Sequence, residues 1–278
     1  MESIVKDDDC IQFLRWSLVR LRMRWDGFRK VRGQVCKRIV RRMHDLGIAD
    51  IGTYRSFLEK NDVEWTVLDS LCRITISRFY RDREVFRFLE EDVFVKLSQN
   101  AVERGDSVLR CWSIGCASGE EPYTLAILWN LVIAPRFPCL ELRILATDAD
   151  IRMVGRAVEG RYAAGSLAHL PAEWTRRAFI RKDGRYCIKD EVREKICFVV
   201  HDIRGVIHQD KFHIIFCRNL VFTYFDASLQ QQMLSRMRDR LLPGGVLVIG
   251  VHEALPAGSR GFVRWPGSRG VYLRVRNQ

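Results

Sequence analysis

The sequence predicts an α/β protein, in which an all-helical domain over residues 1–80 precedes a domain with a mostly parallel sheet over residues 81–278. The chain has 278 residues, of which 47% are hydrophobic and 29% are charged, as is typical of a globular protein. Within the first eighty residues, apolar side chains recur at steps of three and four, the spacing of one helix face. From about Val108, short apolar runs alternate with helical stretches, which indicates a sheet covered by helices.

Two helices are expected near the N-terminus. The first is indicated by five apolar residues at helical spacing: Ile11, Leu14, Leu18, Leu21 and Trp25. The second is expected after a break at Gly33, and Gly47 is placed to cap its end. One face of the second helix carries four apolar residues: Cys36, Ile39, Val40 and Met43.

Basic residues are concentrated in this region. The formal net charge of the chain is +12, and between Arg15 and Arg42 there are eleven Lys and Arg residues against one acid, Asp26. The face of the second helix opposite its apolar residues carries four of them: Lys37, Arg38, Arg41 and Arg42. This face is either a solvated surface or a docking surface, and nucleic acid, a membrane surface and an acidic protein are its possible partners.

Five strands of a parallel sheet are expected after the helical domain. Their sequences are, in order, "VLRCWSI", "LRILATD", "ICFVVHD", "FHIIFCRN" and "GGVLVIGV". The final stretch "GFVRWPGSRGVYLRVRN" predicts two strands joined by a turn, with no helix between them. A terminal antiparallel hairpin added to a parallel sheet is the arrangement expected of class I (Rossmann-like) methyltransferases.

A small inserted β-hairpin subdomain is predicted at about residues 172–195, between the second and third strands. Within "FIRKDGRYCIKDEV", Asp183 and Gly184 separate two strand-like runs. An Asp-Gly pair in this position is a strong signal for a two-residue hairpin turn.

The glycine-rich turn in "WSIGCASGEEPYTLAI", residues 112–127, resembles a phosphate-binding loop but carries two adjacent carboxylates, Glu120 and Glu121. Carboxylates repel a pyrophosphate, whereas they attract a ligand with positive charge. S-adenosylmethionine combines a nucleoside with a sulfonium and an ammonium group and has no phosphate. Gly115 allows close approach of the backbone to such a ligand. The alternative interpretation is an ordinary strand-to-helix turn.

Acidic residues end the next two strands. Asp148 ends "ILATD", at the position where nucleoside-binding folds bind ribose hydroxyls. Asp202 ends "FVVHD" and is expected by the same reasoning to reach the adenine edge. Each acid taken alone is more typical of a cap or a surface residue, but together with the glycine turn they favour a cofactor site.

Four segments of the chain resemble motifs of the CheR-type methyltransferases: "GCASGEEPYTLAI", "ILATDAD", "FHIIFCRNLVFTYFD" and "GVHEAL". That family transfers methyl groups from S-adenosylmethionine to glutamate side chains of bacterial chemoreceptors. The resemblance extends from about Phe13 to Val275. It includes "VRGQVCKRIVRRMHDLGI", which is similar to the family's basic helix, and "ITISRFYRD", which is similar to its T-x-F-F-R-D segment.

The resemblance implies roles for individual residues. Arg81 and Tyr224 match catalytic positions, and the basic stripe of the second helix matches a docking surface for an acidic protein substrate, which in that family is a receptor's cytoplasmic domain. The positions that match cofactor contacts are Thr75, Ser77, Arg81, Gly115, Glu121, Asp148, Asp202, Ile203, Arg218 and Asn219. No metal is implied.

The sequence departs from the family pattern at four places. Arg78 adds a positive charge to the "ITISRFYRD" segment, and "RNLVFTYFD" is one residue longer than the usual pattern around the tyrosine. The hairpin at Asp183 is shorter than in members that tether to a receptor tail peptide. "GVHEAL" differs from the usual "GHSE" spacing, so His252 and Glu253 receive no role.

Two other functions compete with protein methylation. A nucleic-acid methyltransferase would suit the basic region. However, the place of the usual D/N-P-P-Y/F motif reads "CRNLVFTYF". The Pro138-Cys139 pair is like the nucleophile of cytosine-C5 methyltransferases, but it precedes the second strand, far from where that cysteine belongs. A non-catalytic adaptor that kept the fold is the second alternative, and the acids at the cofactor positions argue against it.

The nine cysteines and the N-terminus predict a cytoplasmic protein. No two cysteines form a C-x-x-C pair, so reduced, buried thiols without a metal are expected. "MESIVKDDDC" has acids where a secretory signal has basic residues, and no run approaches the length needed to cross a bilayer.

Overall fold

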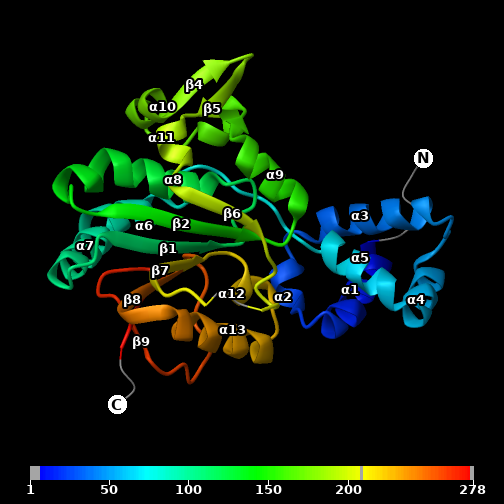
Figure 1. Ribbon diagram of the computed structural model, residues 1–278. Helices are drawn as coiled ribbons and strands as arrows, with labels where there is room; N and C mark the ends of the chain where they lie inside the picture. Colours follow the sequence, from blue (N-terminus) through cyan, green and yellow to red (C-terminus); the bar gives the residue numbers. More distant parts are fainter. Residues whose placement is uncertain (1–6, 207–208, 276–278) are drawn as a thin grey trace. The chain divides into compact units, whose positions relative to one another are not determined.

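A computed structural model of the chain describes residues 7–206 and 209–275, which form two compact units (Figure 1). The first unit contains the described chain up to Ile74 together with Thr223–Gln230. The second contains Thr75–Phe222 and the chain from Gln231 onward. The sequence placed a domain boundary at residue 80 and did not assign residues 223–230 to the helical domain.

The first unit is helical, as predicted. Its helices are α1 (Asp7–Arg20), α2 (Trp25–Phe28), α3 (Arg32–Asp45), α4 (Ile51–Lys60) and α5 (Asp62–Leu71). The prediction that the first helix continues to Trp25 was wrong. Arg22 has a φ of 57°, in the left-handed region, and the chain turns there before α2 begins.

The start of α3 differs from the prediction, whereas its end agrees with it. Gly33 lies in the first turn of the helix, where added side-chain atoms would meet no neighbour, so it is not a break. Gly47 has a φ of 69°, and the amide of Ile48 donates to the Met43 carbonyl at 2.9 Å. This left-handed glycine cap ends the helix as expected.

The prediction that all cysteines are reduced and buried was wrong. Cys10 of α1 and Cys36 of α3 form a disulfide, because the packing of the two helices brings their Cα atoms to 6.1 Å. Cys139 and Cys197 are exposed thiols. Sequence spacing did not reveal the pair, since the two residues are 26 positions apart and lie on different helices.

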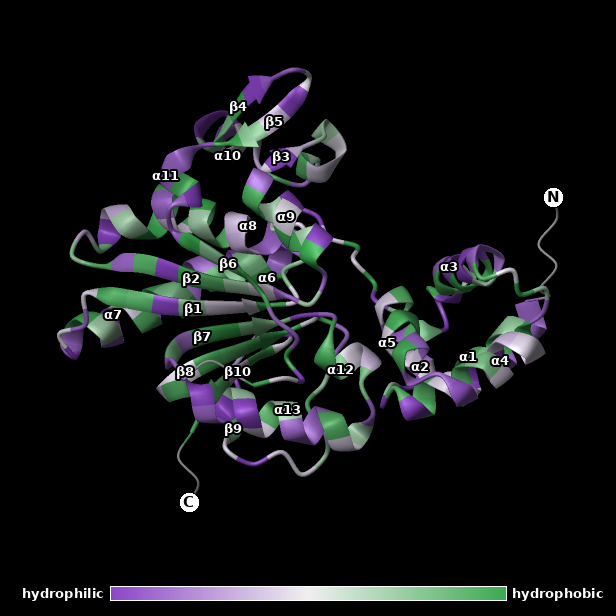
Figure 2. Ribbon diagram, turned by 45° about the vertical axis from the view of Figure 1, so that its right-hand side comes forward, coloured by the Kyte–Doolittle hydropathy of each residue, from purple (hydrophilic) through white to green (hydrophobic). Residues whose placement is uncertain are grey.

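The second unit is built on a seven-stranded sheet, and Figure 2 shows its strands as mainly apolar. The strands are β1 (Val108–Ile114), β2 (Glu141–Asp148), β6 (Ile196–Val200), β7 (Phe212–Cys217), β8 (Leu241–Ile249), β9 (Phe262–Arg264) and β10 (Val271–Arg274). Their order is β6-β2-β1-β7-β8-β10-β9, and all neighbours up to β8 are parallel. β10 runs antiparallel to both β8 and β9. The predicted class I arrangement is confirmed.

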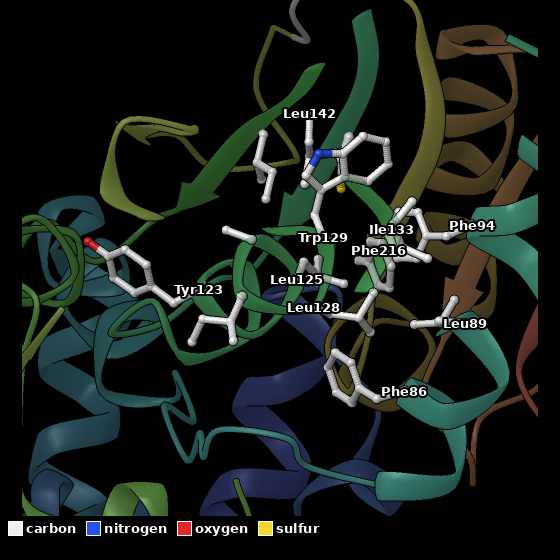
Figure 3. Packing of buried hydrophobic residues seen from close by; sticks show 14 of the residues in the cluster. Phe86, Leu89, Phe94, Tyr123, Leu125, Leu128, Trp129, Ile133, Leu142 and Phe216 are labelled. Atoms are coloured by element: carbon white, nitrogen blue, oxygen red, sulfur yellow. The ribbon is translucent and has the colours of Figure 1, made fainter. Parts of the chain in front are cut away.

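Further helices lie between Arg83 and Arg240. They are α6 (Arg83–Phe88), η1 (Leu89–Val93), α7 (Phe94–Glu103), α8 (Glu120–Leu128), η2 (Trp129–Ile133), η3 (Ala134–Arg136), α9 (Ile151–Glu159), η4 (Ala164–Leu167), α10 (Ala172–Ala178), α11 (Asp190–Arg193), α12 (Val221–Tyr224) and α13 (Ala227–Arg240). Figure 3 shows buried side chains of α7, η2 and β7 meeting in one core, among them Phe94, Trp129 and Phe216. Within the described ranges, no helix is long and apolar enough to cross a membrane.

The predicted hairpin is confirmed. β4 (Phe179–Lys182) and β5 (Arg185–Ile188) pair antiparallel, and Asp183 and Gly184 between them both have positive φ, as a two-residue turn of this kind requires. β3 (Arg161–Tyr162) adds a third strand that the sequence did not indicate. In Figures 1 and 2 this small sheet stands apart from the main sheet, with α10 beside it.

Candidate cofactor and acceptor site

The turn after β1 requires glycine. Gly115 has a φ of 72°, and a Cβ atom there would lie 2.8 Å from Cδ2 of Leu220. The amides of Gly115 and Cys116 both donate to the Thr147 carbonyl, at 2.7 and 3.0 Å. The turn is therefore held against the end of β2 and has Leu220, which follows β7, on its other side.

Asp148 shapes the same turn from the tip of β2. Its Oδ2 accepts from the Ala117 amide at 2.8 Å, and its Oδ1 accepts from the Asp150 amide at 2.8 Å. The amide of His201, just after β6, donates to the Asp148 carbonyl at 2.9 Å. The ends of β1, β2 and β6 thus meet, as the carboxyl ends of parallel neighbours must.

Asp202 is half-buried and paired. Its carboxylate binds the Arg204 guanidinium, with the shortest nitrogen–oxygen distance at 2.6 Å, and also accepts from the Arg204 amide at 2.9 Å. Ile203 beside it is buried. Arg204 was not predicted, and the D-x-R spacing after a strand was the signal that could have indicated this pair.

A buried arginine joins three parts of the second unit. Arg218, at the end of β7, has a side chain that is 3% exposed. Its guanidinium binds Glu121 of α8 at 3.0 Å and Asp82 at 2.6 Å, and also donates to the Arg81 carbonyl. Glu121 in turn accepts from the Ser113 hydroxyl of β1 at 2.8 Å. A buried guanidinium needs such partners to offset its lost hydration.

The segment that carries Arg81 has an irregular backbone. Tyr80 and Asp82 both have positive φ, near 55° and 62°, and the Tyr80 amide donates to Thr124 of α8 at 3.1 Å. Arg81 donates from Nη1 to the Ile76 carbonyl at 3.1 Å. Thr75 is half-buried at the start of this segment.

A cavity of about 1160 Å³ lies beside this segment. Its lining includes Ser77 and Arg81, two of the predicted site residues. Further arginines line it: Arg78, Arg83 and Arg269. The two acids of the lining are Asp82, which already pairs with Arg218, and Glu84.

The "GVHEAL" stretch, left without a role by the sequence, lies next to these groups. His252 is exposed and lines the cavity. Glu253 accepts from the amides of Gly250 and Asn219 through one oxygen, at 2.6 and 2.9 Å. Asn219 has a φ of 55°.

Tyr224 belongs to the first unit by its packing. Its ring lies 5.0 Å from that of Phe28, and its carbonyl accepts from the Arg24 amide at 2.8 Å. A Cβ atom on Gly27 would collide with the neighbouring Thr223 carbonyl at 2.3 Å. The catalytic role expected for Tyr224 stays a prediction.

The predicted basic stripe of α3 is divided in two. Arg38 donates to the carbonyls of Leu71 and Arg73, and Arg42 binds the buried carboxylate of Glu64 at 2.7 Å. Lys37 and Arg41 are exposed. The view of all four as one open face was wrong, because α5 packs beside α3 and takes up two of them.

Residues 75–270 match the family described as CheR methyltransferase, SAM binding domain. The chain belongs to the CheR methyltransferase family. A chemotaxis protein methyltransferase of Listeria innocua is 36% identical over 204 residues, which cover 73% of this chain and 74% of that protein. One of Escherichia coli is 29% identical over 232 residues, covering 80% and 76%.

A third relative is much longer. A 104.1 kDa uncharacterized protein of Rhodobacter capsulatus is 34% identical over 225 residues, which cover 80% of this chain but only 23% of that protein. The match with this chain thus covers about a quarter of the length of that relative.

The cofactor of this CheR-family chain is S-adenosylmethionine, as predicted. The residues present fit it. The carboxylates of Asp148 and Asp202 follow the neighbouring strands β2 and β6 beside the glycine turn, where they can accept hydrogen bonds from a nucleoside, and Glu121 in the first turn of α8 is paired with Arg218. Within the described ranges, no group of three His, Cys, Asp or Glu residues is arranged to hold a metal.

Proposed function

We propose that this chain transfers the methyl group of S-adenosylmethionine to glutamate side chains of a protein substrate, a chemoreceptor-like signalling protein. The observation that carries the proposal is the cationic cavity beside Arg81. The names of the relatives support a chemotaxis substrate.

The charge of the cavity favours a carboxylate acceptor. Its lining contains four arginines, at positions 78, 81, 83 and 269, against the carboxylates of Asp82 and Glu84. Asp82 pairs with buried Arg218, a partner that it shares with Glu121. The excess positive charge attracts an anionic side chain and repels a protonated amine.

We assign the cofactor to the carboxyl ends of β1, β2 and β6. Gly115 gives the backbone close approach, Asp148 binds the ribose hydroxyls, and Asp202 with Ile203 lies at the adenine edge. The remaining predicted contacts surround the reacting end: Thr75, Ser77, Arg81, Glu121, Arg218 and Asn219. Glu121 and Arg218 act as a pair, because each already binds the other.

When bound, the cofactor supplies an electrophilic methyl group on a sulfonium. The chain needs no general base, since a glutamate side chain is ionised at neutral pH. Arg81 holds one oxygen of the acceptor carboxylate and so orients the other. The Arg81 guanidinium donates a hydrogen bond to the Ile76 carbonyl, which restricts its orientation. The contribution of the protein is therefore alignment and exclusion of water.

The product distinguishes this function from its rivals. A glutamate methyl ester is hydrolysed by mild alkali to volatile methanol, whereas N-methyl groups are stable to alkali. We expect the full chain, incubated with labelled cofactor and a receptor cytoplasmic domain, to place label on protein that nuclease does not remove and alkali releases as methanol. Alkali-stable label on nucleic acid would contradict the proposal, as would cofactor binding without any transfer to the receptor.

A matched pair of variants tests the role of Arg81. Arg81→Ala should lower kcat by about a hundredfold, because one positioned charge-assisted contact to the acceptor is lost. Arg181→Ala, which removes an exposed arginine of β4, should leave the rate unchanged. Equal rates for the two variants would remove Arg81 from the reaction.

A further inference from the structure

One carboxylate oxygen connects the ends of two central strands. Oε2 of Glu253 accepts from the Gly250 amide, at the end of β8, at 2.6 Å and from the Asn219 amide, after β7, at 2.9 Å. Glu253 is half-buried. β7 and β8 are parallel neighbours, so the carboxylate lies at the edge of the sheet where the cofactor residues gather.

We propose that Glu253 is a positioning residue for cofactor binding, which it supports by fixing the backbone of Asn219. The inference rests on the cofactor site proposed above and does not depend on which acceptor is methylated. Neither sequence motif nor spacing assigned Glu253 a role.

The contact with Glu253 matters because Asn219 has an unusual backbone conformation. With a φ of 55° the residue adopts the left-handed conformation, which Asn tolerates better than most residues but does not prefer. An external acceptor for its amide stabilises that conformation. Rotation about this φ would change the direction of the chain between Arg218 and Leu220.

Both neighbours of Asn219 touch cofactor elements. Arg218 precedes it and binds Glu121 and Asp82. Leu220 follows it and packs so closely over Gly115 that no Cβ atom fits there. The conformation of Asn219 therefore sets the positions of the Glu121 carboxylate and of the glycine turn at once.

Gly250 offers an independent way to disturb the same contact. A Cβ atom on Gly250 would lie 2.8 Å from Oε2 of Glu253 and 3.0 Å from Oδ1 of Asn219. Gly250→Ala therefore displaces these two side chains while Glu253 is still present. Gly155→Ala is its matched control, since added atoms there meet nothing within 4 Å.

The test measures the affinity of full-length variants for S-adenosylhomocysteine by calorimetry, together with the thermal unfolding midpoint. Glu253→Ala should weaken binding by about tenfold or more, since the loss of hydrogen bonds to a charged group has effects of this size. Glu253→Gln should restore most of the affinity, because its amide oxygen accepts from the same two amides. Gly250→Ala should weaken binding by a similar factor, and Glu103→Ala, at an exposed glutamate, should not.

Two outcomes would overturn the inference in different ways. If Glu253→Ala and Gly250→Ala lower the midpoint but bind with wild-type affinity, while Asp148→Ala binds weakly, Glu253 serves stability alone and the proposed site stands. If Asp148→Ala also binds with wild-type affinity, the cofactor site itself is misplaced. Should Glu253→Ala fail to fold, Glu253→Gln and Gly250→Ala decide by the same comparison.

Discussion

Asp148, at the tip of β2, has one structural role and one proposed role in binding. Its carboxylate accepts from the amides of Ala117 and Asp150, so it shapes the glycine turn, and we propose that it also binds ribose hydroxyls. The sequence predicted the role in ribose binding from the place of Asp148 at the end of a strand. It could not predict the hydrogen bond to the glycine turn, because Ala117 is 31 positions away along the chain.

We expect Asp148→Ala to weaken binding of S-adenosylmethionine and S-adenosylhomocysteine by about ten- to a hundredfold, since a hydrogen bond to a charged group contributes about 1.5–3 kcal/mol. Calorimetry on the folded variant measures this. Asp183→Ala, in the exposed hairpin turn, is the control and should bind as the wild type does. Unchanged affinity in Asp148→Ala would exclude the residue from the site.

Glu64 is a buried carboxylate of the helical unit, and its side chain is 3% exposed. Burial raises its pKa, but hydrogen bonds from Arg42 and Tyr54 outweigh burial, so the pKa is lowered from its ordinary value of 4.5. A lowered folded-state pKa means that the resulting stability is present above pH 4.5 and is lost as pH falls through the folded value.

Glu64→Gln should therefore lower the free energy of unfolding by about 3 kcal/mol at neutral pH, because it leaves Arg42 without its charged partner. The difference from the wild type should shrink as the pH falls below 4.5 and through the lowered folded-state pKa, where the wild-type carboxylate becomes protonated. Urea denaturation across this range measures both. Glu59→Gln, in a surface pair with Arg55, should cost less than about 1 kcal/mol; a constant difference at all pH values would contradict the ionic explanation.

At the scale of elements, α3 shows how a helical pattern can mislead. The periodicity identified the helix and its glycine cap, but the basic side was not all solvent-exposed, because α5 accepts hydrogen bonds from Arg38 and Arg42 through Leu71 and Glu64. Lys37 and Arg41 remain exposed. A docking surface on α3 must therefore rest on these two.

The double variant Lys37→Glu, Arg41→Glu should slow methylation of the receptor domain at low salt, with a smaller effect at high salt and unchanged cofactor affinity. Initial rates at several salt concentrations measure this. Arg38→Glu should instead lower the unfolding midpoint, since it loses its contacts to two carbonyls. If the double variant methylates at the wild-type rate in low salt, these residues form only a solvated face.

The inserted hairpin shows the opposite case. Its turn was predictable from Asp183 and Gly184, because turn geometry depends on the two residues themselves. β3, with two residues, has no periodicity to detect and exists through its pairing with β5. Short elements that depend on a distant partner carry no local signal.

For the whole molecule, the notable feature is that the helical unit is discontinuous in sequence. Residues 223–230 pack within it, through the Arg22–Asp226 ion pair and the Phe28–Tyr224 ring contact. Met23 and Phe225 also form an antiparallel bridge. A cut at the predicted domain boundary separates these partners.

A fragment of residues 1–80 should therefore unfold at a lower temperature than the same helices in the full chain. The fragment lacks Phe225 and Tyr224, which contact Met23 and Phe28. Circular dichroism of the fragment and of the full chain provides the comparison. Addition of a peptide of residues 221–232 should raise the midpoint of the fragment, whereas a scrambled peptide should not. A fragment as stable as the full chain would show that residues 223–230 contribute nothing to the unit.

Local patterns were sufficient to indicate the helices, the parallel strands, the terminal hairpin and the acids at the strand ends, since each depends on residues a few positions apart. The pairing of Arg218 with Asp82 joins residues 136 positions apart, and the contact of Glu253 with Asn219 spans 34. The disulfide and the placement of residues 223–230 are contacts of the same kind. Such contacts were decided only when the chain folded, because the free energy of a buried ion pair or a packed ring depends on which surfaces meet and not on the residues beside it in sequence.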